Sequence, residues 1–109
     1  MGGDLEELAR EVVAFRDERD WRQFHSPRNL AAAISVEAAE LLEIYQWQEP
    51  AGARARAAEE IADIAIYLLT LAHDLQIDLG DAVRDKLLKN AERYPADEVR
   101  GSAEKKPHK

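Results

Sequence analysis

The 109-residue sequence lacks cysteine altogether, so it can form neither a disulfide framework nor a thiolate metal site. It also lacks a basic excess. The formal net charge is -7, which argues against nucleic acid as the main partner because binding that polymer usually needs a basic face. No signal peptide is visible, and the longest apolar run, around Asp63, is too short to span a bilayer. We therefore expect a cytoplasmic protein that binds no nucleic-acid polymer and no membrane.

Signals for β-strands and internal repeats are absent as well, and the remaining pattern is helical. Asp4 and Glu7 have the spacing of a capping box, which predicts a helix start with Asp4 as the N-cap. Ser26 followed by Pro27 predicts a second start, with the serine as N-cap and the proline at the first helical position. The predicted helices cover residues 5–19, 27–46, 54–75 and 79–93.

Short connections between four helices predict an all-α fold, a four-helix bundle that forms one domain over residues 1–95. From residue 96 to residue 109 the sequence turns polar, and there we expect a disordered tail. The apolar surface is generous for so short a chain, so we also expect a homo-oligomer.

Two acidic pairs stand out in the middle of the sequence, and each has the i,i+3 spacing that places two carboxylates on one face of a helix. The first pair is Glu37 with Glu40, and the second is Glu60 with Asp63. Asp63 is the only charged residue of an apolar run, and Glu37 falls in an apolar stripe of its helix. Burying an unpaired carboxylate costs several kcal/mol, yet the segment 29–47 holds no lysine or arginine.

Three interpretations of these acids compete. The carboxylates can be ordinary solvated residues, they can be neutralised by Arg54, Arg56 or the fourth helix, or they can bind a divalent cation. We favour the cation, because two such pairs on successive helices are unusual for a solvated face. Carboxylate oxygens suit Mg2+, or Mn2+, better than zinc. Since Mg2+ usually completes its shell with water and substrate phosphates, the pattern indicates phosphate chemistry, here without a glycine-rich phosphate loop.

Candidate groups for a phosphorylated substrate lie around the acidic helices. Arg28 opens the second helix, where the helix dipole also favours anions, although such an arginine is more often simply solvated. Trp21 and Trp47 flank the same helix. Tryptophan beside a loop is usually a packing residue, and a stacking surface for a nucleobase is the functional alternative. The fourth helix adds Lys86, Asn90 and Arg93.

Several motifs, taken in order, make the sequence similar to a known family. They read WRQFHSPRNL from residue 21, ExxE from residue 37, YQW from residue 45, EExxD from residue 59 and ERYP from residue 92. Together they resemble the MazG-like all-α nucleoside triphosphate pyrophosphohydrolases, and most of all the dCTP pyrophosphatase branch. The resemblance extends over residues 5–96.

This resemblance implies Mg2+-dependent cleavage of a nucleoside triphosphate, with dCTP or a modified dCTP as the substrate, to the monophosphate and pyrophosphate. The implied metal ligands are Glu37, Glu40, Glu60 and Asp63. The residues that we expect to bind the substrate are Trp21, His25, Arg28, Trp47, Tyr67, Lys86, Asn90 and Arg93. The family forms dimers or tetramers, in agreement with the expected homo-oligomer.

The general base and the substrate stay open at this stage. Glu37 or Glu40 is the expected catalytic base, since burial raises the pKa of a carboxyl group while a bound metal lowers it. Val12 offers no hydrogen bond to a base or sugar, so dUTP or phosphoribosyl-ATP is an alternative substrate. Outside enzymes, the alternative is a helical interaction module that holds a structural cation.

Overall fold

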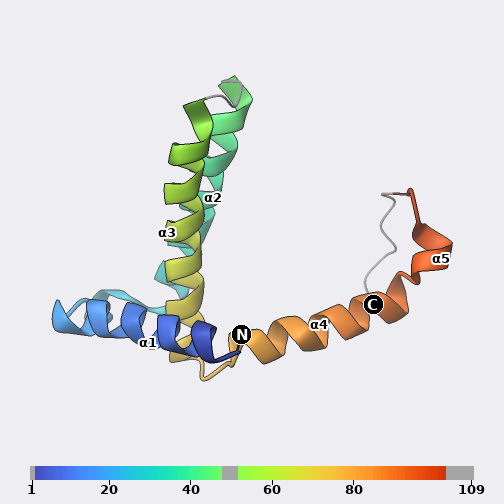
Figure 1. Cartoon of the computed structure of the whole chain (residues 1–109). Coiled ribbons are helices and arrows are strands. Elements are labelled where there is room, and N and C mark those ends of the chain that lie inside the picture. The colour runs from blue at the N-terminus through green and yellow to red at the C-terminus, as the bar shows by residue number, and fades with distance from the viewer. Residues whose placement is uncertain (1, 48–51, 103–109) are drawn as a thin grey trace. The chain divides into compact units, whose positions relative to one another are not determined.

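The computed structural model describes residues 2–47 and 52–102, and all regular structure within them is helical (Figure 1). The bounds are α1 Gly2–Glu18, the 3-10 helix η1 Arg22–Phe24, α2 Pro27–Trp47, α3 Ala53–Asp74, α4 Leu79–Arg93 and α5 Ala96–Val99. The all-α prediction is therefore confirmed. None of the helices in this part of the chain is long and apolar enough to cross a membrane.

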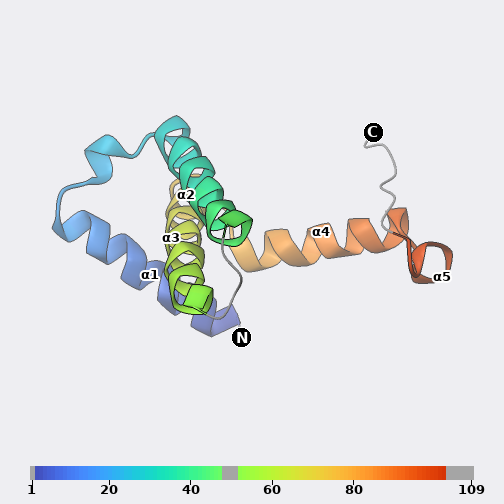
Figure 2. The ribbon, with the colours of Figure 1, turned by 90° about the horizontal axis from the view of Figure 1, so that it is seen from above.

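The chain divides into two compact units, Met1–Ile77 with helices α1 to α3 and Asp78–Lys109 with α4 and α5. In the first unit α3 contacts both other helices. α3 lies beside α2, and α1 lies across α3 (Figure 1, Figure 2). The buried apolar side chains between these helices are small to medium in size and include Val13, Leu30, Ile44, Ala53, Ala57, Leu69 and Ala72.

The start of α1 differs from the predicted one, whereas its end lies within one residue of the prediction. The helix begins before Asp4, so Asp4 lies in its first turn and the N-cap prediction is wrong. An acid there still stabilises the helix, because its charge meets the positive end of the helix dipole. The helix ends in a Schellman motif, in which the N–H of Trp21 donates to the Arg16 carbonyl (3.2 Å) and the N–H of Asp20 donates to that of Asp17 (3.0 Å). Asp20 has the left-handed φ of 54° that this motif requires.

The start of α2 is as the sequence predicts. The Ser26 hydroxyl oxygen accepts a hydrogen bond from the backbone N–H of Asn29 (3.0 Å), and Pro27 is the first helical residue. The side-chain amide of Asn29 also donates to the Phe24 carbonyl (3.1 Å), which ties η1 to the first turn of α2. α3 matches its predicted segment to within one residue at each end.

In the second unit α4 begins and ends where the sequence predicts. Asp78 is its N-cap, and the carboxylate accepts a hydrogen bond from the backbone N–H of Asp81 (2.9 Å). The helix ends at Arg93, directly before Tyr94 and Pro95.

The segment after Pro95 is partly helical, which corrects the expectation of a tail that is disordered from residue 96. Residues Ala96–Val99 form α5, because the Pro95 carbonyl accepts hydrogen bonds from the N–H groups of Glu98 (2.9 Å) and Val99 (3.1 Å). The same proline therefore ends one helix and opens the next. Residues 103–109 of the predicted tail lie outside the described residues, and the domain boundary at residue 95 stays a prediction.

Candidate metal centre

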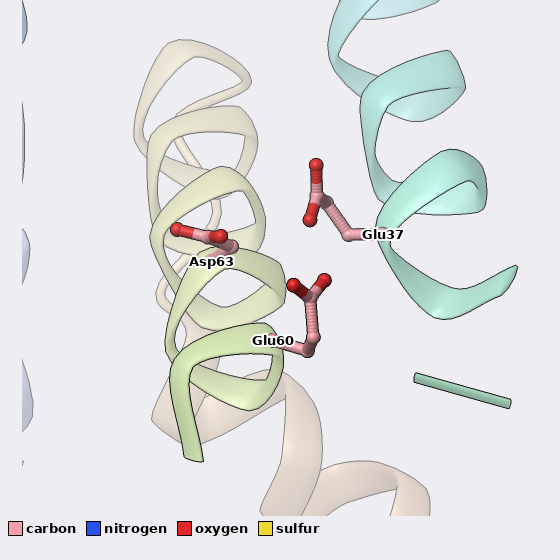
Figure 3. A group of neighbouring side chains, drawn as sticks. All are labelled: Glu37, Glu60 and Asp63. Atoms are coloured by element: carbon pink, nitrogen blue, oxygen red, sulfur yellow. The ribbon is translucent and has the colours of Figure 1, made fainter. Parts of the chain in front are cut away.

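Three acidic side chains of α2 and α3 lie close together in the first unit (Figure 3). Glu37 projects from α2 toward α3, and Glu60 and Asp63 project from neighbouring turns of α3. One carboxylate oxygen from each residue takes part in a group whose atoms all lie within 4.8 Å of one another. Three hard oxygens this close together can share one small cation, so we describe the group as a candidate metal centre.

The packed stripe of α2 is what brings Glu37 to α3. Leu30 and Ile44 stand seven residues before and seven residues after Glu37, and they are only 1% and 3% exposed. Residues seven apart are two helical turns apart, so all three lie in one stripe that faces the neighbouring helix. On α3 the buried Ala57 precedes Glu60 by one turn. The predicted position of Glu37 in an apolar stripe is therefore confirmed.

The pKa of Glu37 shows how strongly the acids interact. It is raised to about 7, first by hydrogen bonding with the Glu60 carboxylate, then by desolvation, and then by the negative charges of Glu40 and Glu60. A carboxyl group that keeps its proton near neutral pH has no positive charge beside it. A cation at this position would supply that charge.

Glu60 contributes a buried oxygen atom to the group. Its Oε2 atom is buried and has no hydrogen-bond partner among the described residues. Ion pairs between described side chains lie elsewhere, and none of them involves Glu37, Glu60 or Asp63. These four ion pairs therefore do not neutralise the three acids. A buried acceptor beside two further carboxylates fits a hard divalent cation.

Glu40, the fourth predicted ligand, is not part of this group. Its side chain is exposed one turn further along α2, although its charge contributes to the raised pKa of Glu37. Its role as a ligand stays a prediction.

Three predicted substrate-binding residues lie on α2, on α3 or directly before α2. Tyr67 is half-buried one turn after Asp63. His25 is half-buried between η1 and α2, and its Nδ1 atom is buried without a hydrogen-bond partner among the described residues. Arg28 is exposed in the first turn of α2. Their contact with a substrate stays a prediction.

Trp21 lies between α1 and η1 and is 44% exposed. Its ring packs edge-to-face on Phe15, with ring centroids 6.0 Å apart. Trp47 is the last residue of α2, and its side chain lies outside the described part of the structure. The three remaining predicted residues, Lys86, Asn90 and Arg93, lie on α4 in the second unit.

Two features of the first unit are missing from the sequence-based predictions. One is a buried ion pair between Arg16 of α1 and Asp74 of α3, whose signal is that Arg16 follows Val12 at i+4 in the apolar stripe of α1. The other is an apolar cavity of about 420 Å³ between α1 and α3, lined by Val12, Phe15, Ile66 and neighbouring side chains. None of the clustered acids lines this cavity.

Comparisons with known proteins show which family the whole chain resembles. A model of the MazG-like family matches residues 32–107. The dCTP pyrophosphatase 1 of Bos taurus is 46% identical over 91% of this chain, and that of Homo sapiens is 44% identical over 93% of it. The chain spans only 64% and 65% of the lengths of those two proteins. The crystal structure of a pyrophosphatase from Archaeoglobus fulgidus is similar, with a TM-score of 0.76, 42% identity, and coverage of 84% of this chain and 93% of that one.

Proposed function

Because the chain belongs to the MazG-like family, we propose that it hydrolyses a nucleoside triphosphate between the α and β phosphates, releasing the monophosphate and pyrophosphate. The observation that carries the proposal is the group of Glu37, Glu60 and Asp63, which share no ion pair with a described basic side chain. Relatives named as dCTP pyrophosphatases make dCTP, or a modified dCTP, the substrate that we propose.

The cation that we propose is Mg2+, with Mn2+ as a substitute. Glu37, Glu60 and Asp63 would hold it, with Glu40 as the fourth ligand. When bound, such a cation offsets the negative charge of the triphosphate and of the departing pyrophosphate. Ligand chemistry supports this choice, since the proposed ligands are all carboxylates and the sequence has no cysteine.

Glu37 or Glu40 is the residue that we propose as the general base. A carboxylate oxygen of that residue accepts a proton from the attacking water as the bond between the α and β phosphates breaks. Glu37 lies within the group of acids, and without a cation its pKa is raised to about 7, a value that a bound cation would lower. Glu40 is the alternative, since its exposed carboxylate lies one turn away.

The nucleotide is proposed to lie along α2 and α3, with its phosphates at the acids and its base toward the start of α2. At 1.5 Å per residue, Pro27 lies roughly 15 Å along α2 from Glu37, which is comparable with an extended nucleoside triphosphate. Trp21 and His25, just before that start, are proposed to bind the base, and Tyr67 is proposed to lie between the two ends. The other proposed substrate-binding residues are Arg28, Trp47, Lys86, Asn90 and Arg93.

Pyrophosphate release from a panel of nucleoside triphosphates, with Mg2+ or with EDTA, tests the proposal. We expect turnover of dCTP with Mg2+ and none with EDTA. Asp63→Asn should abolish turnover and weaken Mg2+ binding, because it removes one charged ligand. Glu43→Gln, an exposed position on α2, is the control and should keep full activity. The proposal fails if every triphosphate is inert, or if Asp63→Asn turns over like the wild type.

A further inference from the structure

A buried ion pair ties the last turn of α1 to the last turn of α3. The side chain of Arg16 is 3% exposed, and its Nη1 atom donates to Oδ2 of Asp74 at 2.7 Å. The Nε atom donates to Oδ1 of Asp17 at 3.1 Å. Arg16 and Asp74 are 58 positions apart in the sequence, so their contact fixes how two helices meet. The guanidinium is directed at α3 and is not available to a substrate.

The backbone of Arg16 also forms a hydrogen bond with the backbone of Trp21. Its carbonyl oxygen accepts the N–H of Trp21 in the Schellman motif that ends α1. The Trp21 ring then packs on Phe15, and the guanidinium of Arg19 lies 3.6 Å from the centre of the Phe15 ring. The position of the Trp21 ring therefore depends on the last turn of α1, and that turn is attached to α3 by Arg16.

Stability alone is a poor reason for this ion pair. Replacing a buried charged pair by apolar side chains of similar volume is often neutral or stabilising, because taking two charges out of water is costly. Here the cost is larger still, since Oδ1 of Asp74 is buried without a hydrogen-bond partner among the described residues. Burial by itself would raise the pKa of Asp74, but the hydrogen bond and charge of Arg16 hold it below its usual value. Apolar packing alone could hold the two helices together at this position, so the directional, charged contact needs another explanation.

We propose that Arg16 and Asp74 are positioning residues, which hold the last turn of α1 against α3 so that Trp21 is presented to the base of the nucleotide. This inference rests on the proposed function, in which Trp21 binds the base. Neither residue of the pair touches the substrate. Their effect is therefore on nucleotide binding through Trp21, and the carboxylates of the metal centre are left as they are.

Steady-state kinetics with dCTP test whether the ion pair affects nucleotide binding and leaves the chemical step unchanged. Arg16→Met keeps the length of the side chain and removes its charge, and we expect KM to rise about tenfold, the loss of one stacking contact, while kcat stays near the wild-type value. Asp74→Asn, which keeps the shape of its side chain, should give the same split. Arg16→Lys should lie between Arg16→Met and the wild type. The double variant should raise KM no further than either single change, because the two side chains act as one unit.

Val13→Ala is the matched control for a purely structural role. Val13 is a buried residue of the same helix, and its truncation lowers the stability of the α1 packing without touching the ion pair. We expect a lower melting temperature and an unchanged KM. An equal rise of KM in Val13→Ala, or an unchanged KM in both Arg16→Met and Asp74→Asn, would overturn the inference.

An NMR measurement checks the position of Trp21 without any turnover. The indole N–H signal of Trp21, assigned by its loss in Trp21→Phe, should shift in Arg16→Met and Asp74→Asn and stay in place in Val13→Ala. An unshifted signal in the two ion-pair variants overturns the inference even if the enzyme is active. A wild-type protein that is inert toward every triphosphate overturns the proposed function instead, so the two failures can be told apart.

Discussion

At the scale of single residues, Glu37 gives the metal-free protein a definite pH dependence. Its folded-state pKa of about 7 lies above its ordinary value of 4.5, so between these values the folded protein holds a proton that the unfolded chain releases. The stability linked to Glu37 is therefore fully present below the ordinary value and is lost as the pH rises through the folded one. The pH dependence linked to Asp74 has the opposite sign. Its folded-state pKa is lowered, so its contribution to the stability of the fold is present at neutral pH and is lost as the pH falls through that pKa.

We predict that the melting temperature of the protein in EDTA falls between about pH 5 and about pH 8, and that Glu37→Gln flattens this fall. Mg2+ should raise the melting temperature more at the upper end of that range, where the cation no longer competes with a proton. Differential scanning fluorimetry across this range measures both effects, with Glu43→Gln as the control. A fall of equal size in Glu37→Gln would assign the titration to another group.

The difference between the acids and the ion pair shows what a sequence reveals at this scale. Glu37 and Asp63 could be singled out because an acid in an apolar stripe conflicts with its immediate neighbours, and that conflict is visible in the sequence. The pairing of Arg16 with Asp74 depends on how α1 crosses α3, and local pattern carries no information on such a crossing. The position of Arg16 in the apolar stripe of α1 indicates that it is buried, but it does not identify Asp74 as its partner.

At the scale of elements, the helix bounds lie within one residue of the predicted ones apart from the start of α1, but the hydrogen-bonded motifs that end α1 and α3 could not be predicted. Ser26 and Asp78 cap their helices with side-chain oxygens, and these residue types announce a start. The ends of α1 and α3 instead use Asp20 and Gln76 in the left-handed region, with φ of 54° and 58°. The usual signal for such an end is glycine, which is absent at both places.

Gln76 is the position where this difference can be measured. The N–H of Ile77 donates to the Ala72 carbonyl (2.8 Å) and that of Gln76 to the His73 carbonyl (3.0 Å), which is a second Schellman motif. A left-handed φ costs a non-glycine residue about 1–2 kcal/mol in the folded state, and glycine removes this cost. Glycine also gives the unfolded chain more conformational freedom, which lowers the stability of the fold by about 0.5–1 kcal/mol. Gln76→Gly should therefore stabilise the protein by about 0.5–1 kcal/mol in urea unfolding, and Gln76→Ala should not. Asp20 is less suitable, because its side chain and carbonyl both accept hydrogen bonds from Gln23.

At the scale of the whole molecule, the described residues leave much apolar surface exposed. Leu42 and Phe24 are 64% and 62% exposed, and Val36 and Ile61 are more than half exposed. A chain of 109 residues buries a smaller share of its surface than a larger domain does, so it has less core to stabilise it. Where exposed apolar residues adjoin in one patch, they usually mark a contact with another molecule. We take a second copy of the chain as that partner, in line with the homo-oligomer expected from the sequence.

Light scattering coupled to size exclusion should then give the mass of a dimer or tetramer at micromolar concentration. Because association favours the folded state by mass action, the melting temperature should also rise with protein concentration, and a monomer would show no such rise. The two measurements support each other, since a nonspecific aggregate would scatter light without giving a single mass. A single monomeric mass with a melting temperature independent of concentration would leave the exposed leucines and phenylalanine without a partner. In that case assembly could not be the source of this protein's stability, and the small core of α1, α2 and α3 would have to hold the first unit without help from a second copy.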